Sequence, residues 1–225
     1  MPPQVWTITG TDTGVGKTVL TLHLLASLQA SGVDVRAFKP FASGDRSDAE
    51  KLAEMQKGSL SVDQINPRIF KLPLAPFAVT GAGNRTVPAT LKSIQKSAGN
   101  ASHLLLEGIG GLMTPLTRRE TWLDFAVAAG GRVILVAPNR LGVLNHVLLS
   151  IRVLNLANLR QIRVALMEMR RPDLASRSNS RVLRALLGAV RVIEVPFFQN
   201  SPTKIRAIRA RESQFRPLFR GLLES

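Results

Sequence analysis

The sequence lacks cysteine altogether, and only 5% of its residues are aromatic. Without a thiol, the chain has no disulfide, no thiolate metal ligand and no cysteine nucleophile. It also lacks an uninterrupted apolar run of the roughly 18 to 20 residues that a membrane helix needs, and it opens on a strand-like segment in place of a signal peptide. These absences exclude several classes of site and lead us to expect a cytoplasmic protein with no membrane partner.

Acidic residues are scarce, because 15 aspartates and glutamates face 30 lysines and arginines, which gives a formal net charge of +15. Residues 113–225 hold 19 basic against 7 acidic residues, whereas residues 1–112 hold 11 against 8. The arginines are scattered with few aromatics among them, which argues against a nucleic-acid partner. We therefore expect a solvated basic surface that keeps the protein soluble and attracts anionic substrates.

Short β-rich runs alternate with helix-length amphipathic segments along the whole chain. We predict a helix over residues 17–31 and strands over residues 5–9, 35–39, 103–107, 132–137, 163–168 and 191–195. Several of these strands are almost continuously apolar, as strands covered on both faces are. The pattern predicts an α/β fold in a single domain over residues 1–225, with a mostly parallel central sheet and helices on both faces. The irregular stretch 58–88 is expected beside the active site.

A glycine-rich loop, GTDTGVGKT, follows the first predicted strand at residues 10–18. Glycines let the backbone approach phosphates, the helix N-terminus attracts negative charge, the lysine neutralises the terminal phosphates and the final threonine can bind Mg²⁺. Five residues separate Gly10 from Gly16, one more than in the ordinary P-loop. A plain glycine-rich turn is the alternative, but strand, loop and helix stand in the order that phosphate binding needs. We predict that ATP is bound by Thr13, Gly14, Val15, Gly16, Lys17, Thr18 and Val19.

Two carboxylates are candidates to complete a Mg²⁺ site with Thr18, because hard oxygen ligands suit this ion. Glu107 ends a predicted strand, and ligands of open α/β sheets gather at the carboxyl ends of strands. Glu107 as a surface charge and Asp48 as a helix N-cap remain the alternatives. The three histidines have no metal-ligand spacing and are assigned no metal.

Three motifs together resemble the dethiobiotin synthetase family: GTDT-x-VGKT at residues 10–18, KP-x-ASG at 39–44 and EG-x-GG at 107–111. Four further landmarks follow in the family's order, namely NP at 66–67, P-x-x-P at 73–76, TPL at 114–116 and LG-x-x-NH at 141–146. The resemblance therefore spans roughly residues 5–150.

The resemblance implies an ATP-dependent ligase of biotin biosynthesis that carboxylates 7,8-diaminononanoate with carbon dioxide and closes a ureido ring. In this family a substrate amine forms a carbamate, the carbamate takes the γ-phosphoryl group, and the second amine then expels phosphate. The implied catalytic residues are Lys17, Lys39, Thr13 and Ser43, with Mg²⁺ on Thr18, Asp48 and Glu107.

The resemblance also implies a homodimer, in which the helix after Gly142 reaches the partner's substrate site. The implied substrate contacts are Lys39, Ser43, Gly110, Gly111, Leu144 and Asn145. From the residues alone, this helix is equally compatible with an ordinary core helix, and Lys39 with an exposed lysine at a strand end.

The resemblance thins beyond about residue 160. Where the family usually has an asparagine that reads adenine, this chain has LMEM at residues 166–169, with Glu168 near the expected position. Pro196, Phe197 and Phe198 follow the last strand and are the remaining candidates for contacts with the base. We therefore expect weakened discrimination among nucleoside triphosphates.

Two other readings remain open. A different P-loop ATPase of the same group is one, but a partitioning ATPase normally has a second lysine early in the loop, where this chain has Asp12 or Thr13. Amidating synthetases usually carry a catalytic cysteine, which this chain lacks. A degenerate, non-catalytic nucleotide-binding protein is the other reading.

Overall fold

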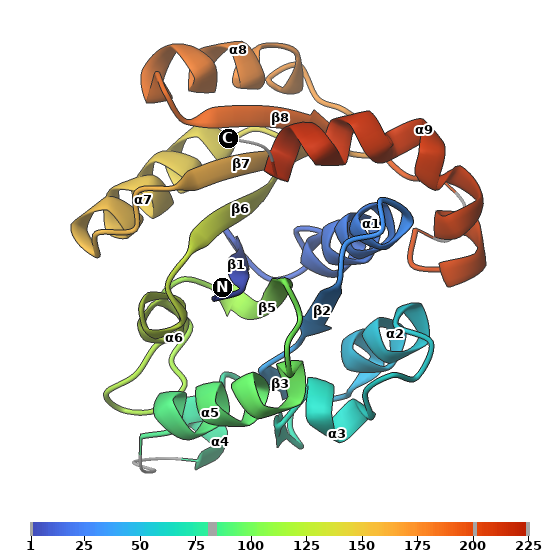
Figure 1. The fold of residues 1–225 in the computed structure, drawn as a ribbon. Coiled ribbons are helices and arrows are strands. Elements are labelled where there is room, and N and C mark those ends of the chain that lie inside the picture. Colours follow the sequence, from blue (N-terminus) through green and yellow to red (C-terminus); the bar gives the residue numbers. More distant parts are fainter. Residues whose placement is uncertain (1, 81–84, 200–201, 224–225) are drawn as a thin grey trace.

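A twisted parallel sheet forms the centre of the molecule (Figure 1). The computed structural model describes residues 2–80, 85–199 and 202–223. Within these residues six strands pair in the order β2-β5-β1-β6-β7-β8, and every pairing is parallel. The strands are β1 (Gln4–Gly10), β2 (Val35–Phe38), β5 (His103–Gly111), β6 (Arg132–Pro138), β7 (Ile162–Met167) and β8 (Arg191–Val195). The sequence prediction of a mostly parallel α/β fold is confirmed.

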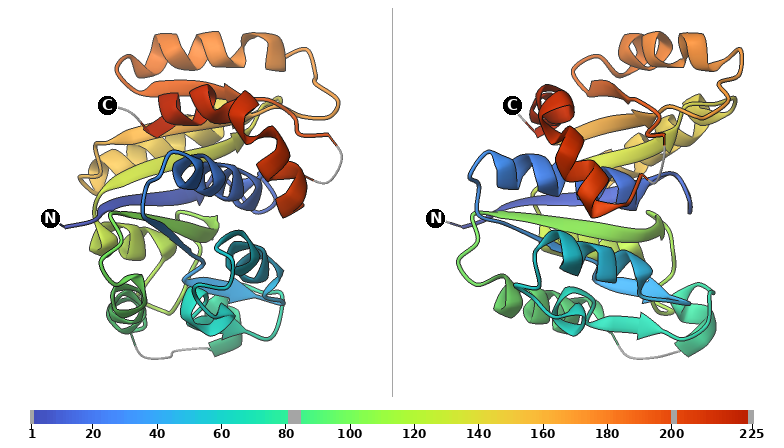
Figure 2. Two further views of the ribbon diagram at one scale, coloured as in Figure 1. Left: turned by 45° about the vertical axis from the view of Figure 1, so that its right-hand side comes forward. Right: turned by 90° about the vertical axis from the view of Figure 1, so that its right-hand side faces the viewer.

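Helices cover both faces of this sheet (Figure 2). One face carries α1 (Lys17–Ala30), α2 (Ser47–Met55) and α9 (Ile205–Leu223), and the other carries α6 (Trp122–Ala129), α7 (Val143–Leu156) and α8 (Ser176–Leu187). A smaller group lies at the β2 edge: β3 (Phe41–Ser43), β4 (Arg68–Phe70), α3 (Val62–Ile65), α4 (Pro76–Thr80) and α5 (Val87–Ala98). None of the described helices combines the length and apolar character needed to cross a membrane.

The predicted strands match the observed ones closely, and two differences matter for the site. Strand β5 continues to Gly111 instead of ending at residue 107, so Glu107 lies inside the strand and not at its end. The stretch 58–88, expected to be irregular, contains α3, β4, α4 and the first residues of α5, while residues 81–84 lie outside the described part. The extension of β5 arises from its pairing with β1, where Gly111 lies opposite Gly10, and local patterns do not encode such pairing.

The central strands are buried on both faces because helices pack on either side of the sheet. The side chains of Trp6 and Ile8 on β1 and of Leu105 on β5 are fully buried, as is the polar Thr7. This burial explains why these strands do not alternate between apolar and polar residues.

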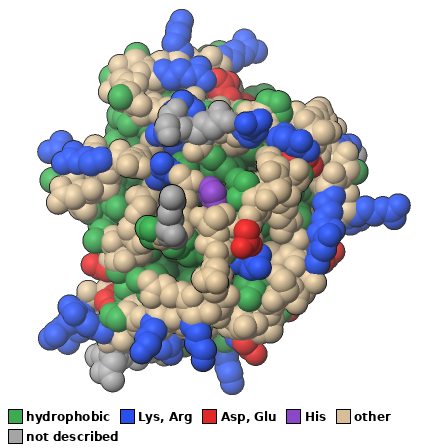
Figure 3. Space-filling model, in the orientation of Figure 1, with side chains coloured by type: hydrophobic (Ala, Val, Ile, Leu, Met, Phe, Trp, Pro, Cys, Tyr) green, Lys and Arg blue, Asp and Glu red, His purple; other side chains and the backbone are tan. Residues whose placement is uncertain are grey.

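The lysine and arginine side chains lie in separate groups on the surface shown in Figure 3.

An aromatic cluster fixes the C-terminal helix α9 to α1. The imidazole of His23 on α1 stacks on Phe198, with ring centroids 4.0 Å apart, and also contacts Phe215 and Phe219 of α9. Burial lowers the pKa of His23 to about 4. The ring is therefore neutral at physiological pH and packs as a core residue.

We predict that His23 makes folding sensitive to mild acid. The unfolded chain protonates His23 below its ordinary pKa of 6.5, whereas the folded chain protonates it only below about 4, so stability falls as the pH drops through this window. From pH 7 to pH 5, the loss attributable to His23 is about 2 kcal/mol. Urea unfolding at pH 7 and pH 5 gives the loss in the free energy of unfolding for the wild type and for His23→Phe. The loss in the wild type minus the loss in the variant is the contribution of His23. Equal losses in both proteins would contradict the prediction.

Candidate active site

The glycine-rich loop joins β1 to α1 and directs its backbone toward a cavity. Gly16 caps α1 in the left-handed region, with φ of 100°, which other residues rarely adopt. A Cβ on Gly10 would lie 2.7 Å from Cγ2 of Val15, so the close turn at this position also requires glycine. The loop therefore places the amides that begin α1 where they can bind an anion.

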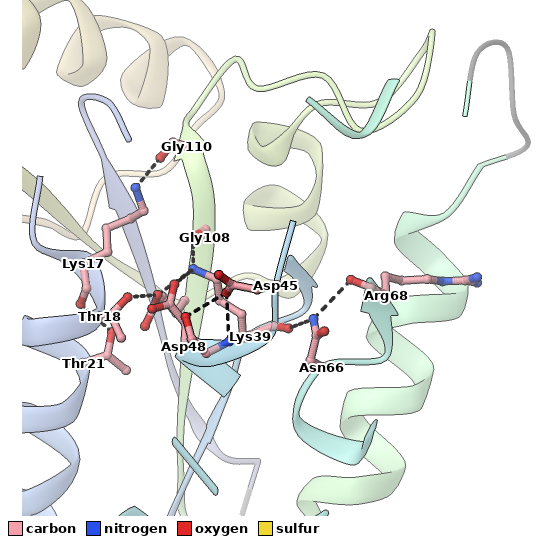
Figure 4. Close-up of polar contacts among 12 residues, drawn as sticks. Lys17, Thr18, Thr21, Lys39, Asp45, Asp48, Asn66, Arg68, Gly108 and Gly110 are labelled. Carbon is pink, nitrogen blue, oxygen red and sulfur yellow. Dashed lines mark hydrogen bonds and ion pairs between the residues drawn. The ribbon is translucent and has the colours of Figure 1, made fainter. Parts of the chain in front are cut away.

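Lys17 is the first residue of α1, and its side chain is only 7% exposed. Its ammonium donates to the carbonyl oxygens of Asp12 and Gly110, both at 2.8 Å, and it points toward β5 (Figure 4). Burial, and then repulsion by the charge of Lys39, lowers the pKa of Lys17 to about 8. This lysine thus lies between the loop and β5, and among the described residues no carboxylate bonds to it directly, so it is well placed to bind an added anion.

Four side chains form a charged group beside Lys17, which we call the Glu107 cluster: Thr18, Lys39, Asp48 and Glu107. The carboxylate of Glu107 is fully buried, and its Oε1 accepts from Nζ of Lys39 at 2.6 Å and from Oγ1 of Thr18 at 2.7 Å. Asp48, in the first turn of α2, lies 3.1 Å from the same ammonium. The three candidate metal ligands and one of the candidate catalytic lysines therefore lie together. Figure 4 shows Thr18, Lys39 and Asp48 of this cluster.

The backbone around Lys39 is held in place from the β4 side. The side-chain amide of the fully buried Asn66 donates to the carbonyl of Lys39 at 2.7 Å and to that of Arg68 at 3.1 Å. Burial by itself would lower the pKa of Lys39, but the charges of Glu107 and Asp48 outweigh it and raise the pKa. Lys39 is therefore a buried ammonium that is charged at physiological pH, and not an exposed lysine at a strand end.

A cavity of about 640 Å³ opens beside the Glu107 cluster. Among the residues singled out from the sequence, its wall contains Thr13, Gly14, Gly16, Lys17, Thr18, Val19, Lys39, Ser43, Asp48 and Gly110. The hydroxyl of Ser43 is buried and makes no hydrogen bond within the described residues. A substrate oxygen or nitrogen in the cavity can satisfy it.

Some lining residues were not among the sequence candidates: Asp45, Pro73, Leu74, Ala75, Ile109, Thr114 and Pro115. The motifs that resemble the family include Pro73, Thr114 and Pro115, so the sequence could have indicated that these three residues lie near the site. Nothing local in the sequence distinguishes Asp45 from an ordinary turn residue, because it accepts hydrogen bonds from the backbone and hydroxyl of Ser47 just before α2.

Other candidates lie outside this cavity. Leu144 and Asn145 are on α7, where Asn145 borders a separate cavity on the outer face of that helix. Gly111 lies at the end of β5 beside Thr114, and the side chain of Val15 is in the core. Pro196, Phe197 and Phe198 follow β8. This strand lies on the other side of β1 from β5 and the Glu107 cluster.

The donor set of the Glu107 cluster fits a divalent cation. Oε2 of Glu107 is buried without a hydrogen-bond partner, so a ligand atom in the core of the site is unsatisfied. The described residues contain no group of three or more His, Cys, Asp or Glu side chains that could hold a metal ion by themselves. Two carboxylates and a hydroxyl agree with the way in which Mg²⁺ is usually bound, through one or two carboxylates and the phosphates of a substrate.

The family model described as an AAA domain matches residues 4–203. The ATP-dependent dethiobiotin synthetase BioD of Anaeromyxobacter dehalogenans (strain 2CP-C) is 40% identical over 153 residues, covering 65% of this chain and 69% of its own. The protein of the same name from Bacillus licheniformis is 32% identical over 207 residues, covering 88% of both. The chain belongs to the dethiobiotin synthetase family. The similarity to the second relative extends beyond residue 150, where the motif resemblance thins.

Solved structures agree on the fold of this dethiobiotin synthetase family member. The MinD cell division protein of Aquifex aeolicus superposes with a TM-score of 0.61 at 14% identity, over 99% of this chain and 97% of that one. The pNOB8 ParA protein bound to nonspecific DNA superposes with a TM-score of 0.59 at 13% identity, over 98% and 96%. At such identities the similarity supports a shared P-loop ATPase fold and nothing more specific.

We predict that nucleotide binding raises the pKa of Lys17, so that Lys17 takes up a proton when the nucleotide binds at high pH. In the free protein its pKa is about 8, and a bound phosphate raises it, so ADP affinity falls as the pH rises above this value. Calorimetric titrations with ADP, in two buffers of different ionisation enthalpy, should give an uptake of about one proton at pH 9 and almost none at pH 7. The same small uptake at both pH values would contradict this assignment.

Proposed function

We propose that this chain is an ATP-dependent dethiobiotin synthetase, which carboxylates 7,8-diaminononanoate with CO₂ and closes the ureido ring while ATP becomes ADP and phosphate. The observation that carries the proposal is the pair of buried ammonium groups, Lys17 and Lys39, on one cavity that the glycine-rich loop also lines. The names and identities of the relatives support the same reaction.

The chemistry requires cations at this position. An amine of the substrate attacks carbon dioxide, loses a proton and becomes an anionic carbamate. This carbamate must then approach the triphosphate, which is also anionic, and preorganised positive charge in a dry site lowers the cost of bringing the two together. We assign Lys17 to the terminal phosphates, because it belongs to the glycine-rich loop, and Lys39 to the carbamate, because Lys39 and Ser43 line the same cavity from the segment that follows β2. Thr13 and Ser43 would donate hydrogen bonds to the carbamate region.

Ring closure follows in two steps. A carbamate oxygen bonds to the γ-phosphorus as the bond to the β-γ bridging oxygen breaks, which gives a carbamic-phosphoric anhydride and ADP. The second amine attacks the anhydride carbon, the carbon-oxygen bond to phosphate breaks, and the amine proton leaves with the phosphate. The protein's contribution is to hold the reacting groups in line and to stabilise charge, so no dedicated base is assigned.

We further propose that Mg²⁺ acts with ATP and that Thr18, Asp48 and Glu107 hold it. The ion would neutralise charge on the β- and γ-phosphates. The unsatisfied Oε2 of Glu107 and the hard oxygen donor set support this assignment. Gly110 and Gly111 would shape the adjoining backbone against the substrate. Because the reaction consumes ATP, we propose that it takes place in the cytoplasm.

We predict that phosphate release from ATP depends on diaminononanoate and that Lys39→Met abolishes most of it. Lys39 should act on the carbamate and not on the nucleotide, so the variant should bind ADP within a few-fold of the wild type. Turnover should fall by about a hundredfold or more, the usual effect of removing one electrostatic contact to the reacting group. The measurement is phosphate release with ATP, Mg²⁺ and bicarbonate, with and without the diamine.

Lys92→Met on α5 is the matched control, because Lys92 is an exposed lysine that does not line the cavity. It should leave both ADP binding and turnover unchanged. Phosphate release at the same rate with and without the diamine would contradict the proposed function. Equal losses of ADP affinity and turnover in Lys39→Met would contradict the division of labour between the two lysines.

The outer face of α7 supports the proposal that the protein is a homodimer. Leu149 and Leu156 are 56% and 77% exposed, and Leu141 just before the helix is 80% exposed. A cavity beside them is bordered by Asn145. Apolar groups exposed together in this way are typical of an interface, and we propose that this helix presents Leu144 and Asn145 to the partner's substrate.

We predict that light scattering finds a dimer and that Leu149→Glu converts it to a monomer, because a buried unpaired carboxylate is costly at an apolar interface. Leu174→Glu is the matched control, since Leu174 is 81% exposed on the segment before α8. It should remain dimeric. A wild type that is monomeric at working concentrations and fully active would contradict the proposed interface.

A further inference from the structure

A polar network lies at the carboxyl edge of the sheet, outside the cavity described above. Glu168 directly follows β7, and its backbone N–H donates to the carbonyl of Val195 at the end of β8 at 2.8 Å. The amide of Asn139, after β6, donates in the same way to Met167. These bonds tie the ends of three neighbouring strands together and fix the position of Glu168.

The glycine-rich loop lies next to this network. A Cβ on Gly16 would be 3.1 Å from Cε of Met167, so the residue before Glu168 packs directly against the loop. Strand β7 is separated from β1 by β6 alone, which places it about 10 Å from β1 at the usual strand spacing. Glu168 is therefore close to the phosphate site, on the side opposite β5.

This side is where the nucleoside end of a bound nucleotide should lie. Lys17 points toward β5, and the Glu107 cluster is on the β5 and β2 side of the loop. The terminal phosphates are therefore directed toward β5, and the nucleoside extends the other way, over the ends of β6 and β7. This step rests on the nucleotide site of the proposed function.

The carboxylate of Glu168 is held in one orientation. Oε1 accepts from Nδ2 of Asn139 at 2.7 Å. The Asn139 side chain is itself fixed, because its amide also donates to Ser176 and its Oδ1 accepts from Asn179 at 2.9 Å. No described residue donates to Oε2 of the half-buried Glu168. The network thus presents a carboxylate with one oxygen free to accept.

The segment after β8 borders the same edge and offers a ring. Phe198 is buried and stacked on His23, so its side chain is committed to the core. Phe197 is 42% exposed and can pack against a base. An acceptor and an exposed aromatic residue therefore follow the ends of two neighbouring strands, β7 and β8.

We propose that Glu168 reads the hydrogen-bond donor edge of the nucleotide base, and that the chain accepts GTP as a phosphoryl donor alongside ATP. A carboxylate only accepts hydrogen bonds. Guanine presents two adjacent donors, N1–H and the N2 amino group, whereas adenine and cytosine present one amino group beside an acceptor nitrogen. Guanine is the base whose donor edge matches Glu168 best.

The test compares catalytic efficiencies for diamine-dependent phosphate release with ATP, GTP and CTP at equal Mg²⁺. We expect GTP to be used within a hundredfold of ATP. Glu168→Gln should lower the GTP to ATP ratio at least tenfold, because the amide can keep the bond from Asn139 and turn its NH₂ toward the donors of guanine. It should leave the CTP to ATP ratio within a few-fold of the wild type.

The matched control is Glu194→Gln. Glu194 is on β8, the strand next to β7, and its carboxylate is paired with Ser180 and Arg184 of α8. It should leave all three ratios unchanged. An ATP preference above a hundredfold, or a GTP to ATP ratio that Glu168→Gln does not change, would overturn the proposal.

Binding without the diamine separates this proposal from the proposed function. The affinities for GDP and ADP can be measured by calorimetry on the wild type and both variants. If turnover fails but the GDP to ADP affinity ratio falls at least tenfold in Glu168→Gln, the reaction is misassigned and the role of Glu168 stands. If ATP is turned over and GDP affinity is insensitive to Glu168, the reaction stands and the role of Glu168 is wrong.

Discussion

The buried carboxylate of Glu107 is the constraint on which the rest of the site depends. A charge with no exposure to water is strongly destabilising unless it is paired and hydrogen-bonded. Glu107 lies in β5, between β1 and β2, so its partners come from the elements that follow those two strands: Thr18 from α1, and Lys39 from the end of β2. The sheet order therefore determines which elements supply these partners, and the buried carboxylate is neutralised by Lys39 and hydrogen-bonded by Thr18.

The same arrangement prepares the site for phosphates. Lys39 stays charged because Glu107 and Asp48 raise its pKa. The pKa of Lys17 is lowered to about 8, and its hydrogen bonds to the described residues are to carbonyl oxygens. The charge of Lys39 is thus balanced by two carboxylates, whereas the ammonium of Lys17 bonds to carbonyl oxygens and can still pair with an anion. A nucleotide phosphate satisfies the second lysine without disturbing the first, which is the form of preorganisation that catalysis of phosphoryl transfer requires.

Local sequence patterns predicted most of the fold and the nucleotide loop, because strand, glycine-rich turn and helix are adjacent in the chain. The burial of Glu107 was not predictable in this way, since it depends on β5 pairing between two strands distant in sequence. Asp45 was missed because its local sequence is that of an ordinary turn before a helix, and only the folded structure shows that it lines the cavity. Leu144 and Asn145 do not line the cavity of their own chain, so the substrate contact proposed for them would require a second copy.

The central claim is that this site closes a ureido ring around carbon taken from carbon dioxide. The most direct measurement supplies the purified protein with diaminononanoate, ATP, Mg²⁺ and ¹³C-bicarbonate, and follows the product by mass spectrometry. The account predicts a cyclic product that carries one ¹³C atom and forms in equal amount to the phosphate released. Phosphate release without incorporation of the label, or no product at all, would contradict it.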